Sequence, residues 1–375
     1  MKASELPSRN ARIDLLRGIA ILLVLLLHFT LSYRLTESPL VNWIPRAWLR
    51  ALLINGNYGV TLFFVISGYL ITSITLERFG SPETVRAGGF YRFRFARIFP
   101  GLLLALALIV PLGCLGLPSF RNEVEGLIWS RSAFVAVTAS VLSFWHNVLM
   151  AYRGYFNYAL NIYWSLSVEE VFYLGFPWVC LALRRRRWLL VLCAAAILLG
   201  PWYRSLHTDD EIRFMYAYPA CFDAIAFGCA AALAARRFPL GIRTARALSL
   251  LGAGLVTVTY LRGIGGHEVW GFTQIALGAA LLAWGSRSSS SGWAPLGWLG
   301  RHSYELYLFH IIVLGLMRDW IGRNRMPWGW KLPWLGLFLG LSCLVAWVVA
   351  RWWTEPWNRR LRGDYSTPTS SRSRA

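Results

Sequence analysis

The sequence predicts an all-α membrane protein, a polytopic helix bundle of about ten transmembrane helices with cytoplasmic N- and C-termini. Of its 375 residues, 56% are apolar and the mean hydropathy is +0.46. Soluble domains are typically about 45–50% apolar, so the excess points to lipid. Apolar stretches of roughly 18–22 residues recur along the chain, and each can cross a hydrocarbon core of about 30 Å. These observations exclude a soluble globular fold.

Ten apolar segments are expected to cross the membrane. They are residues 13–33, 58–77, 98–117, 163–183, 188–204, 214–235, 246–262, 268–285, 303–318 and 334–353. The first is not a cleavable signal peptide, because Asp14 and Arg17 lie at its base and no small-residue cleavage site follows. We expect a cytoplasmic N-terminus at 1–12, one transmembrane domain at 13–356 and a disordered cytoplasmic tail at 357–375.

The distribution of basic residues predicts which loops are cytoplasmic. With ten spans and a cytoplasmic N-terminus, 23 Lys and Arg residues lie inside and 13 lie outside. This agrees with the excess of Lys and Arg that cytoplasmic loops carry. If residues 133–150 also crossed, 16 would lie inside and 20 outside, which the same rule disfavours. We therefore expect 133–150 to be a re-entrant or surface-lying segment on the outer side.

The net charge of +20 has the same explanation, because nearly all of the 38 Lys and Arg residues flank the predicted spans. We therefore expect the lipid bilayer as a partner and no nucleic acid. No set of His, Asp and Glu has metal-ligand spacing, so no metal is expected. Six cysteines lie in or beside apolar segments without CxxC spacing and predict neither disulfides nor a metal site. They are Cys114, Cys180, Cys193, Cys221, Cys229 and Cys343.

Titratable residues within predicted spans are candidates for function, since an intramembrane Arg, Lys or Asp costs roughly 2.5–3.5 kcal/mol on insertion scales. His28 lies about 22 Å from the inner face. Glu169 and Glu170, in WSLSVEEVFY, lie about 20 Å from it. A histidine and carboxylates at one depth predict a base and the group that orients it. Alternatively, His28 is an inter-helix contact and the glutamates are structural partners of Arg17.

Two further intramembrane residues leave their roles open. Asp223, in CFDAIAFGC, lies in the middle of its span. His310, in SYELYLFH, lies about 12 Å from the inner face and fits a structural contact as well as a functional one. Arg17 lies about 16 Å below His28 on the same predicted helix.

An arginine-aromatic cluster precedes the third span, in FYRFRFARIFP. Arg92, Arg94 and Arg97 alternate with aromatic residues, and the last two share a face if the helix has already begun. Guanidiniums beside aromatic rings at the cytoplasmic mouth suit a phosphate-bearing ligand with a flat ring. The alternative is that these arginines only mark the cytoplasmic side.

Six stretches, in this order, resemble the acyltransferase-3 family of integral-membrane acyltransferases over roughly residues 12–356. They are RIDLLRGIAILLVLLLH, GVTLFFVISGYLIT, RFARIFP, WSLSVEEVFY, FDAIAFG and SYELYLFH. The first holds the family's pattern of a basic residue, a ten-residue spacer and a histidine as Arg17 and His28. Thr61 stands where many members have aspartate, so we assign it no catalytic role.

The resemblance implies transfer of an acyl group, often acetyl, from cytoplasmic acyl-CoA to a hydroxyl of a cell-surface glycan, lipid-linked sugar or similar acceptor. It implies a multi-pass enzyme of the cell inner membrane that modifies polysaccharides. His28 would be the base or a transient acyl carrier, Glu169 its preferred orienter and Glu170 the reserve. The residues expected to hold the donor are Arg17, Arg92, Arg94 and Arg97, and those expected to contact the acceptor are Ser67, Asp223 and His310.

The main alternative is a proton-coupled transporter or flippase of a glycan or small metabolite, because intramembrane His, Glu and Asp also form proton relays. The sequence shows no inverted or parallel repeat of the kind that many transporters have. A transporter would also leave the arginine-aromatic cluster without a clear role. Some family members carry a fused periplasmic esterase-like domain, which leaves open whether a separate periplasmic partner protein completes the transfer here.

Overall fold

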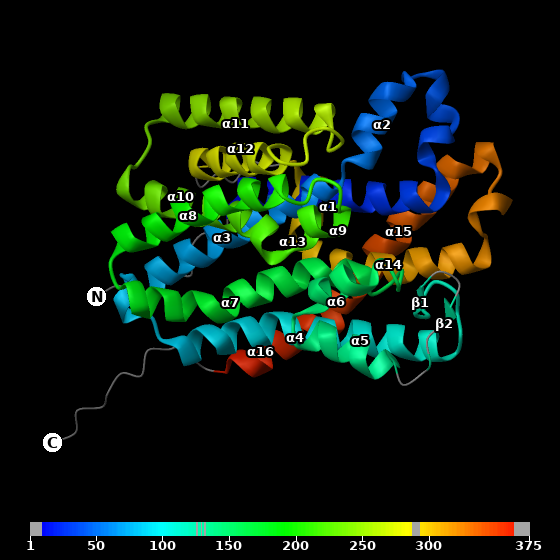
Figure 1. The fold of residues 1–375 in the computed structure, drawn as a ribbon, viewed down its shortest axis with the longest axis horizontal. Coiled ribbons are helices and arrows are strands. Elements are labelled where there is room, and N and C mark those ends of the chain that lie inside the picture. Colours follow the sequence, from blue (N-terminus) through cyan, green and yellow to red (C-terminus); the bar gives the residue numbers. More distant parts are fainter. Residues whose placement is uncertain (1–9, 125–126, 129, 131–132, 287–292, 364–375) are drawn as a thin grey trace.

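Long helices running roughly along one axis form a bundle (Figure 1). The computed structural model describes residues 10–124, 127–128, 130, 133–286 and 293–363. The α-helices are α1 (Ala11–Tyr33), α2 (Arg46–Ile54), α3 (Asn57–Phe79), α4 (Ala87–Cys114), α5 (Ala133–Leu142), α6 (His146–Arg153), α7 (Trp164–Leu183), α8 (Arg186–Ser205), α9 (Glu211–Tyr216), α10 (Tyr218–Arg237), α11 (Ile242–Arg262), α12 (Gly271–Gly285), α13 (Ala294–Arg301), α14 (Ser303–Trp320), α15 (Lys331–Val349) and α16 (Glu355–Arg362).

Shorter elements join these helices. The 3₁₀ turns are η1 (Leu35–Glu37), η2 (Pro39–Asn42), η3 (Pro82–Thr84), η4 (Asn161–Tyr163), η5 (Arg323–Arg325) and η6 (Trp328–Trp330). A π-helical turn, η7 (Ala350–Thr354), joins α15 to α16. The strands β1 (Glu123–Val124) and β2 (Leu127–Ile128) pair antiparallel, with Glu123 opposite Ile128. Neither this small hairpin nor the short helix α2 was predicted from the sequence.

Eight helical segments among the described residues are long and apolar enough to cross a membrane, which confirms the predicted multi-pass helical protein. They are Ala11–Tyr33, Arg46–Phe79, Ala87–Cys114, Asn161–Leu183, Arg186–Ser205, Glu211–Arg237, Ile242–Arg262 and Trp328–Arg362. Two of the ten predicted spans, 268–285 and 303–318, are not among them. The first corresponds to α12, which has only 15 residues. The second corresponds to α14, whose 18 residues include the charged Glu305, Arg318 and Asp319.

The predicted cytoplasmic loops that follow α3, α7 and α10 meet at one end of the bundle, toward the left in Figure 1. Arg186 and Arg236 both donate hydrogen bonds to the carbonyl oxygen of Gly80, at 3.3 and 3.4 Å. Arg92 Nε donates to the carbonyl oxygen of Leu361 at 2.9 Å, which holds α4 against α16. The ends of α3, α10 and α16 and the starts of α4 and α8 therefore share what we call the inner end.

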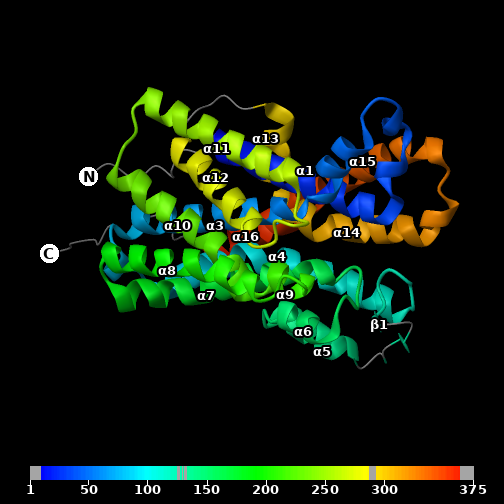
Figure 2. The same ribbon diagram turned by 45° about the horizontal axis from the view of Figure 1, so that its top comes forward.

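The segment 133–150 forms a helical hairpin, α5 and α6, which lie side by side (Figure 2). Phe134, near the start of α5, lies against Gly113 near the last turn of α4. Phe144, in the hairpin's turn, packs against Phe99 with ring centroids 6.1 Å apart. Phe99 precedes Gly113 by 14 residues, or about 21 Å of helix. The hairpin thus turns back within the depth of the bundle, which favours the re-entrant interpretation over the surface-lying one.

Two boundaries differ from those expected. Helix α4 begins at Ala87, so the arginine-aromatic cluster lies on its first turns and not in a loop. Helix α16 extends to Arg362, so residues 357–362 are helical where a disordered tail was predicted. Contacts with α4 order this segment: besides the Arg92 bond, Trp353 Nε1 donates to the carbonyl oxygen of Pro100 at 2.8 Å. The rest of the predicted tail, 364–375, and the predicted N-terminus up to residue 9 lie outside the described residues.

Helices α3 and α10 approach each other closely through two glycines. A Cβ added at Gly68 would collide with the carbonyl oxygen of Ile225, and one added at Gly228 with that of Val65. Small residues allow backbones in membranes to pack this closely, and the packing itself then stabilises the pair. The contact places Ser67, next to Gly68, at the middle of the bundle.

We expect Gly228→Ala to destabilise the protein by roughly 1–3 kcal/mol, the usual cost of forcing an atom into a packed interface. The measurement is thermal unfolding of the purified protein in detergent. Gly254→Ala, on α11, is the matched control because nothing lies within 4 Å of its added Cβ. Alanine is also the better helix former, so this control should not be destabilised. A melting temperature for Gly228→Ala at or above that of Gly254→Ala would contradict the prediction.

Candidate active site

His28 on α1 and His310 on α14 form a hydrogen-bonded pair inside the bundle. Nδ1 of His28 and Nε2 of His310 are 3.0 Å apart, and the ring centroids are 5.0 Å apart. On the other side of the His310 ring, Nδ1 lies 2.8 Å from the carbonyl oxygen of Leu306. Each ring nitrogen of His310 therefore has one partner.

This geometry determines where the protons lie. A carbonyl oxygen only accepts hydrogen bonds, so Nδ1 of His310 carries a hydrogen and donates it to Leu306. His310 is fully buried, where a charge would be costly, and a neutral imidazole then offers a lone pair at Nε2. Nδ1 of His28 must donate to that lone pair, which leaves Nε2 of His28 as the basic nitrogen. His28 itself is only partly buried.

A second pair of polar side chains lies one turn from His310 toward the inner end. Tyr307 lies with its ring centroid 6.0 Å from that of His310. Its hydroxyl is 2.6 Å from Ser165 Oγ on α7 and donates to the carbonyl oxygen of Ile162 at 2.8 Å. This contact joins α14 to the first turn of α7, the helix that carries the two candidate glutamates.

Glu169 is the centre of a second cluster, formed by α3, α4 and α7. Its carboxylate accepts hydrogen bonds from Ser67 Oγ at 2.7 Å and from Tyr173 Oη at 3.3 Å. The Arg94 guanidinium lies over the Tyr173 ring, 4.3 Å from its centroid. The charges of Arg94 and Arg17 both act on the Glu169 carboxylate. The structure thus brings three other predicted site residues, Ser67, Arg94 and Arg17, near Glu169.

Glu169 was expected to orient His28, but the described residues show no hydrogen bond between them, and the partner of His28 Nδ1 is His310. The prediction rested on equal depth, and the structure places the two residues at different depths. Tyr307, one turn from His310 toward the inner end, contacts Ser165 at the start of α7. Glu169 lies a further turn along α7 in the same direction. The hydrogen bonds show that His28 faces α14 and that Glu169 faces α3.

The other candidate glutamate and arginines lie toward the inner end. Glu170 is buried, and its Oε1 has no hydrogen-bond partner among the described residues, so this acceptor is available to a ligand. Arg17 Nη2 donates to Ser303 Oγ at 2.8 Å, which joins the first turns of α1 to those of α14. Arg92 and Arg97 are exposed on the first turns of α4.

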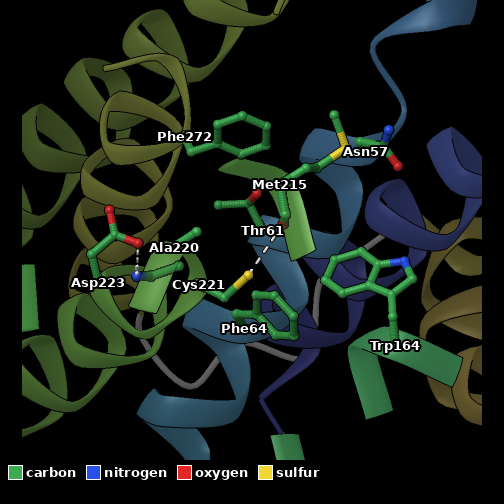
Figure 3. A pocket seen from close by; sticks show the side chains of 10 residues that line it. Asn57, Thr61, Phe64, Trp164, Met215, Ala220, Cys221, Asp223 and Phe272 are labelled. Carbon is green, nitrogen blue, oxygen red and sulfur yellow. Dashed lines mark hydrogen bonds between the residues drawn. The ribbon is translucent and has the colours of Figure 1, made fainter. Parts of the chain in front are cut away.

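Asp223 lies apart from both clusters, at the edge of a small pocket (Figure 3). The fully buried Arg204 donates to both of its carboxylate oxygens, at 2.6 and 3.3 Å. Thr273 Oγ1 and the Ala224 N–H add bonds of 2.8 Å each. Trp164 lies at the opposite edge of the pocket, and Thr61 lies between (Figure 3). The network makes Asp223 the counterion of the buried Arg204. Its expected contact with the acceptor stays a prediction.

We expect Asp223→Asn to destabilise the protein by about 3–5 kcal/mol, because it leaves the Arg204 charge buried without its counterion. The control is Asp210→Asn, since the Asp210–Arg213 pair is solvent-exposed and its loss should cost about 0–1 kcal/mol. Thermal unfolding measures the difference. Equal melting temperatures for the two variants would show that Asp223 is not the structural counterion.

Tyr173, Tyr307 and Arg204 were not among the predicted site residues. A signal for the first two was present: Tyr173 follows Glu169 by four residues, and Tyr307 precedes His310 by three, so each pair shares a helix face. Arg204 was counted among the outer-loop arginines, and no pattern marks it as buried. No group of His, Cys, Asp and Glu in the described part of the chain could hold a metal ion.

The family model described as "Acyltransferase domain", acyltransferase-3, matches residues 10–352. The chain belongs to the acyltransferase-3 family. The match includes both histidines and the whole Glu169 cluster and ends before α16. It confirms the family resemblance seen in the sequence motifs.

Curated relatives of this acyltransferase-3 chain are named O-acetyltransferases. The O-acetyltransferase OatA of Staphylococcus aureus (strain NCTC 8325 / PS 47) is 25% identical over an alignment of 308 positions that covers 74% of this chain and 49% of that protein. The peptidoglycan O-acetyltransferase OatA of Listeria monocytogenes is 26% identical over an alignment of 333 positions that covers 81% of this chain and 49% of the relative. The putative peptidoglycan O-acetyltransferase YrhL of Bacillus subtilis is 28% identical over an alignment of 375 positions that covers 89% of this chain and 52% of the relative.

The chain spans about half the length of the curated relatives it matches. No solved structure shows a significant match to it.

Proposed function

We propose that this protein is an O-acetyltransferase of the cell inner membrane. It takes an acetyl group from acetyl-CoA at the inner end and transfers it to a hydroxyl of a cell-wall glycan, with His28 as the base. The observation that carries the proposal is the His28–His310 pair, which leaves a basic nitrogen on a partly accessible imidazole. Membership of the acyltransferase-3 family and the names of the relatives support the reaction type.

The arrangement of charges supports the direction of transfer. Arg94 and Arg97 lie on the first turns of α4 at the inner end, where acyl-CoA is available. Arg17 and His28 lie on one helix, 11 residues or about 16 Å apart. An acyl arm that enters beside Arg17 and Glu170 would pass the Tyr307 hydroxyl before it reaches His28. The acceptor approaches from the other end of the bundle.

In the proposed step, Nε2 of His28 removes the proton from the acceptor hydroxyl. The oxygen attacks the thioester carbonyl carbon, a C–O ester bond forms and the C–S bond breaks. The CoA thiolate leaves and takes the proton from the His28 imidazolium, so charge and protons balance. Through its bond to Nδ1, His310 stabilises the imidazolium and holds the ring in place, as the third group of a catalytic triad does. A stepwise route, with the acetyl group carried on Nε2 before the acceptor binds, uses the same atom.

The test is transfer by the purified protein in liposomes, with labelled acetyl-CoA and soluble peptidoglycan fragments. We expect labelled ester on the glycan together with an equal amount of free CoA thiol. The control is the same preparation carrying His28→Ala. Movement of the glycan into the vesicles without ester formation or thiol release would reject the proposal and favour the transporter or flippase.

Donor binding gives a further prediction. We expect Arg94→Ala and Arg97→Ala each to weaken acetyl-CoA binding by roughly 1.5–3 kcal/mol, the value of a hydrogen bond to a charged group. Lysine replacements should rescue binding only in part, because the planar guanidinium fork is lost. Isothermal titration with the purified variants measures this. If both alanine variants bind acetyl-CoA with wild-type affinity, Arg94 and Arg97 do not hold the donor and only mark the cytoplasmic side of the membrane.

A further inference from the structure

We propose that Arg78, at the end of α3, and Arg362, on the C-terminal helix α16, complete a phosphate-binding site with Arg94 and Arg97. The site would hold the phosphorylated nucleotide end of the acyl-CoA donor. This inference rests on the proposed function for the identity of the ligand. It also assigns donor binding to a helix outside residues 10–352, the part of the chain that the family domain covers.

One aromatic ring brings the two new arginines together. The Arg78 guanidinium lies 4.0 Å from the centroid of the Phe93 ring, and the Arg362 guanidinium lies 5.4 Å from the same centroid. Phe93 precedes Arg94 on α4, so the ring holds both guanidiniums beside the predicted donor arginines. The hydrogen bond from Arg92 to Leu361 fixes α16 in this position.

The charges around Arg362 are all of one sign. The charged groups that act on it are Arg97, Arg78 and Arg94, and no carboxylate is among them. Within the described part of the chain, none of these four guanidiniums forms an ion pair with a carboxylate. Arg94 is within electrostatic range of the acidic groups of Glu169 and Glu170. Such a concentration of positive charge favours a bound anion.

Arg362 also offers an unused donor. Its Nε is buried and has no hydrogen-bond partner among the described residues. Leaving such a donor unsatisfied is costly, and a phosphate oxygen that accepts from it removes that cost. Guanidiniums bind phosphates through paired N–H donors, and several of them suit a ligand with more than one phosphate. Acyl-CoA carries a 3′-phosphate and a diphosphate at its nucleotide end.

The experiment measures binding of acetyl-CoA and of adenosine 3′,5′-bisphosphate to the purified full chain in phosphatidylcholine nanodiscs. Arg362→Gln and Arg78→Gln should each weaken both ligands by about tenfold, as expected for the loss of a charge-assisted hydrogen bond. Arg360→Gln is the matched control. It removes a guanidinium from the same helix, but from an exposed side chain that lies over Trp357 and does not reach Phe93.

Equal affinity in Arg362→Gln, Arg78→Gln and Arg360→Gln would overturn the proposal. If Arg362→Gln fails to fold, Arg362→Lys replaces it: lost affinity for the bisphosphate supports a guanidinium site, and unchanged affinity rejects it. The proposal would also be overturned if the wild-type protein does not bind the bisphosphate but is thermally stabilised by phosphatidylglycerol in a way that depends on Arg362. The site would then bind a lipid headgroup. Arg362-dependent bisphosphate binding without any acetyl transfer would retain the site and reject the proposed function. If the protein transfers acetyl groups but Arg362→Gln binds both ligands as tightly as the wild type, the proposed function is retained and the phosphate site is rejected.

Discussion

Replacing His28 with alanine should lower acetyl transfer by about 10²–10⁴-fold, the range expected when a general base is removed. The physical reason is the proton arrangement of the histidine pair. With Nδ1 of His28 donating to His310, Nε2 is the one nitrogen that can accept the acceptor's proton. The measurement is turnover per unit of membrane-inserted protein. Acetyl-CoA affinity should stay unchanged, because the arginines at the inner end remain in place.

A matched control separates loss of the base from loss of fold. His207→Ala removes a histidine whose ring stacks on Tyr203 and whose Nδ1 bonds the Tyr203 carbonyl oxygen, away from the paired histidines. It should retain activity. If His28 were only a packing contact, its loss would cost about 0.6 kcal/mol of stability and leave activity per folded molecule intact. Transfer by His28→Ala at a tenth of the parent rate would reject its role as base.

Replacing His310 with leucine should lower turnover by about 10²–10³-fold, although His28 itself is unchanged. Leucine has no acceptor for the His28 Nδ1 hydrogen, so the proton can move to Nε2 and block the base. A comparable tautomer defect in a serine-protease triad costs about 10⁴-fold. His310→Gln is the informative second variant, since the amide oxygen can accept the hydrogen bond in place of Nε2. We expect glutamine to restore much of the activity.

The comparison of the two His310 variants distinguishes positioning from packing. Both remove the imidazole, and both should retain acetyl-CoA affinity, since neither touches the inner arginines. The two variants differ in that only glutamine offers a hydrogen-bond acceptor to Nδ1 of His28. Equal turnover in His310→Leu and His310→Gln would reject the positioning role. Full activity in both variants would show that catalysis does not depend on the orientation of His28 by His310.

Much of the fold could be predicted because membrane helices obey length and charge rules that are local in sequence. The apolar runs predicted the long helices, and the distribution of arginines predicted the loops that meet at Gly80. The same counting predicted that 133–150 does not cross. It could not distinguish a re-entrant segment from a surface-lying one, because that difference depends on the contact between Phe144 and Phe99 within the bundle.

The sequence predicted which residues form the candidate site but not which of them are hydrogen-bonded to each other. Residue number predicted equal depths for His28 and Glu169, but the contact of Tyr307 with the start of α7 places that start below His310, so Glu169 lies nearer the inner end. A helix also presents several faces at each depth. Which face meets which neighbour depends on the packing of α1 against α14 and of α7 against α3. His310 therefore took the place expected for Glu169, and Glu169 bonded Ser67 instead.

By itself, the sequence determined a multi-pass helical membrane protein of the acyltransferase-3 family, because apolar length, basic loops and ordered motifs are all local properties. Only the tertiary structure decided that Asp223 neutralises Arg204, that His310 is hydrogen-bonded to His28 and that Arg78 and Arg362, far apart in the sequence, lie against the same Phe93 ring. Each of these pairs joins residues from different helices. Their contacts arise from helix packing, which depends on the fit of whole surfaces and so leaves no signal at any single position.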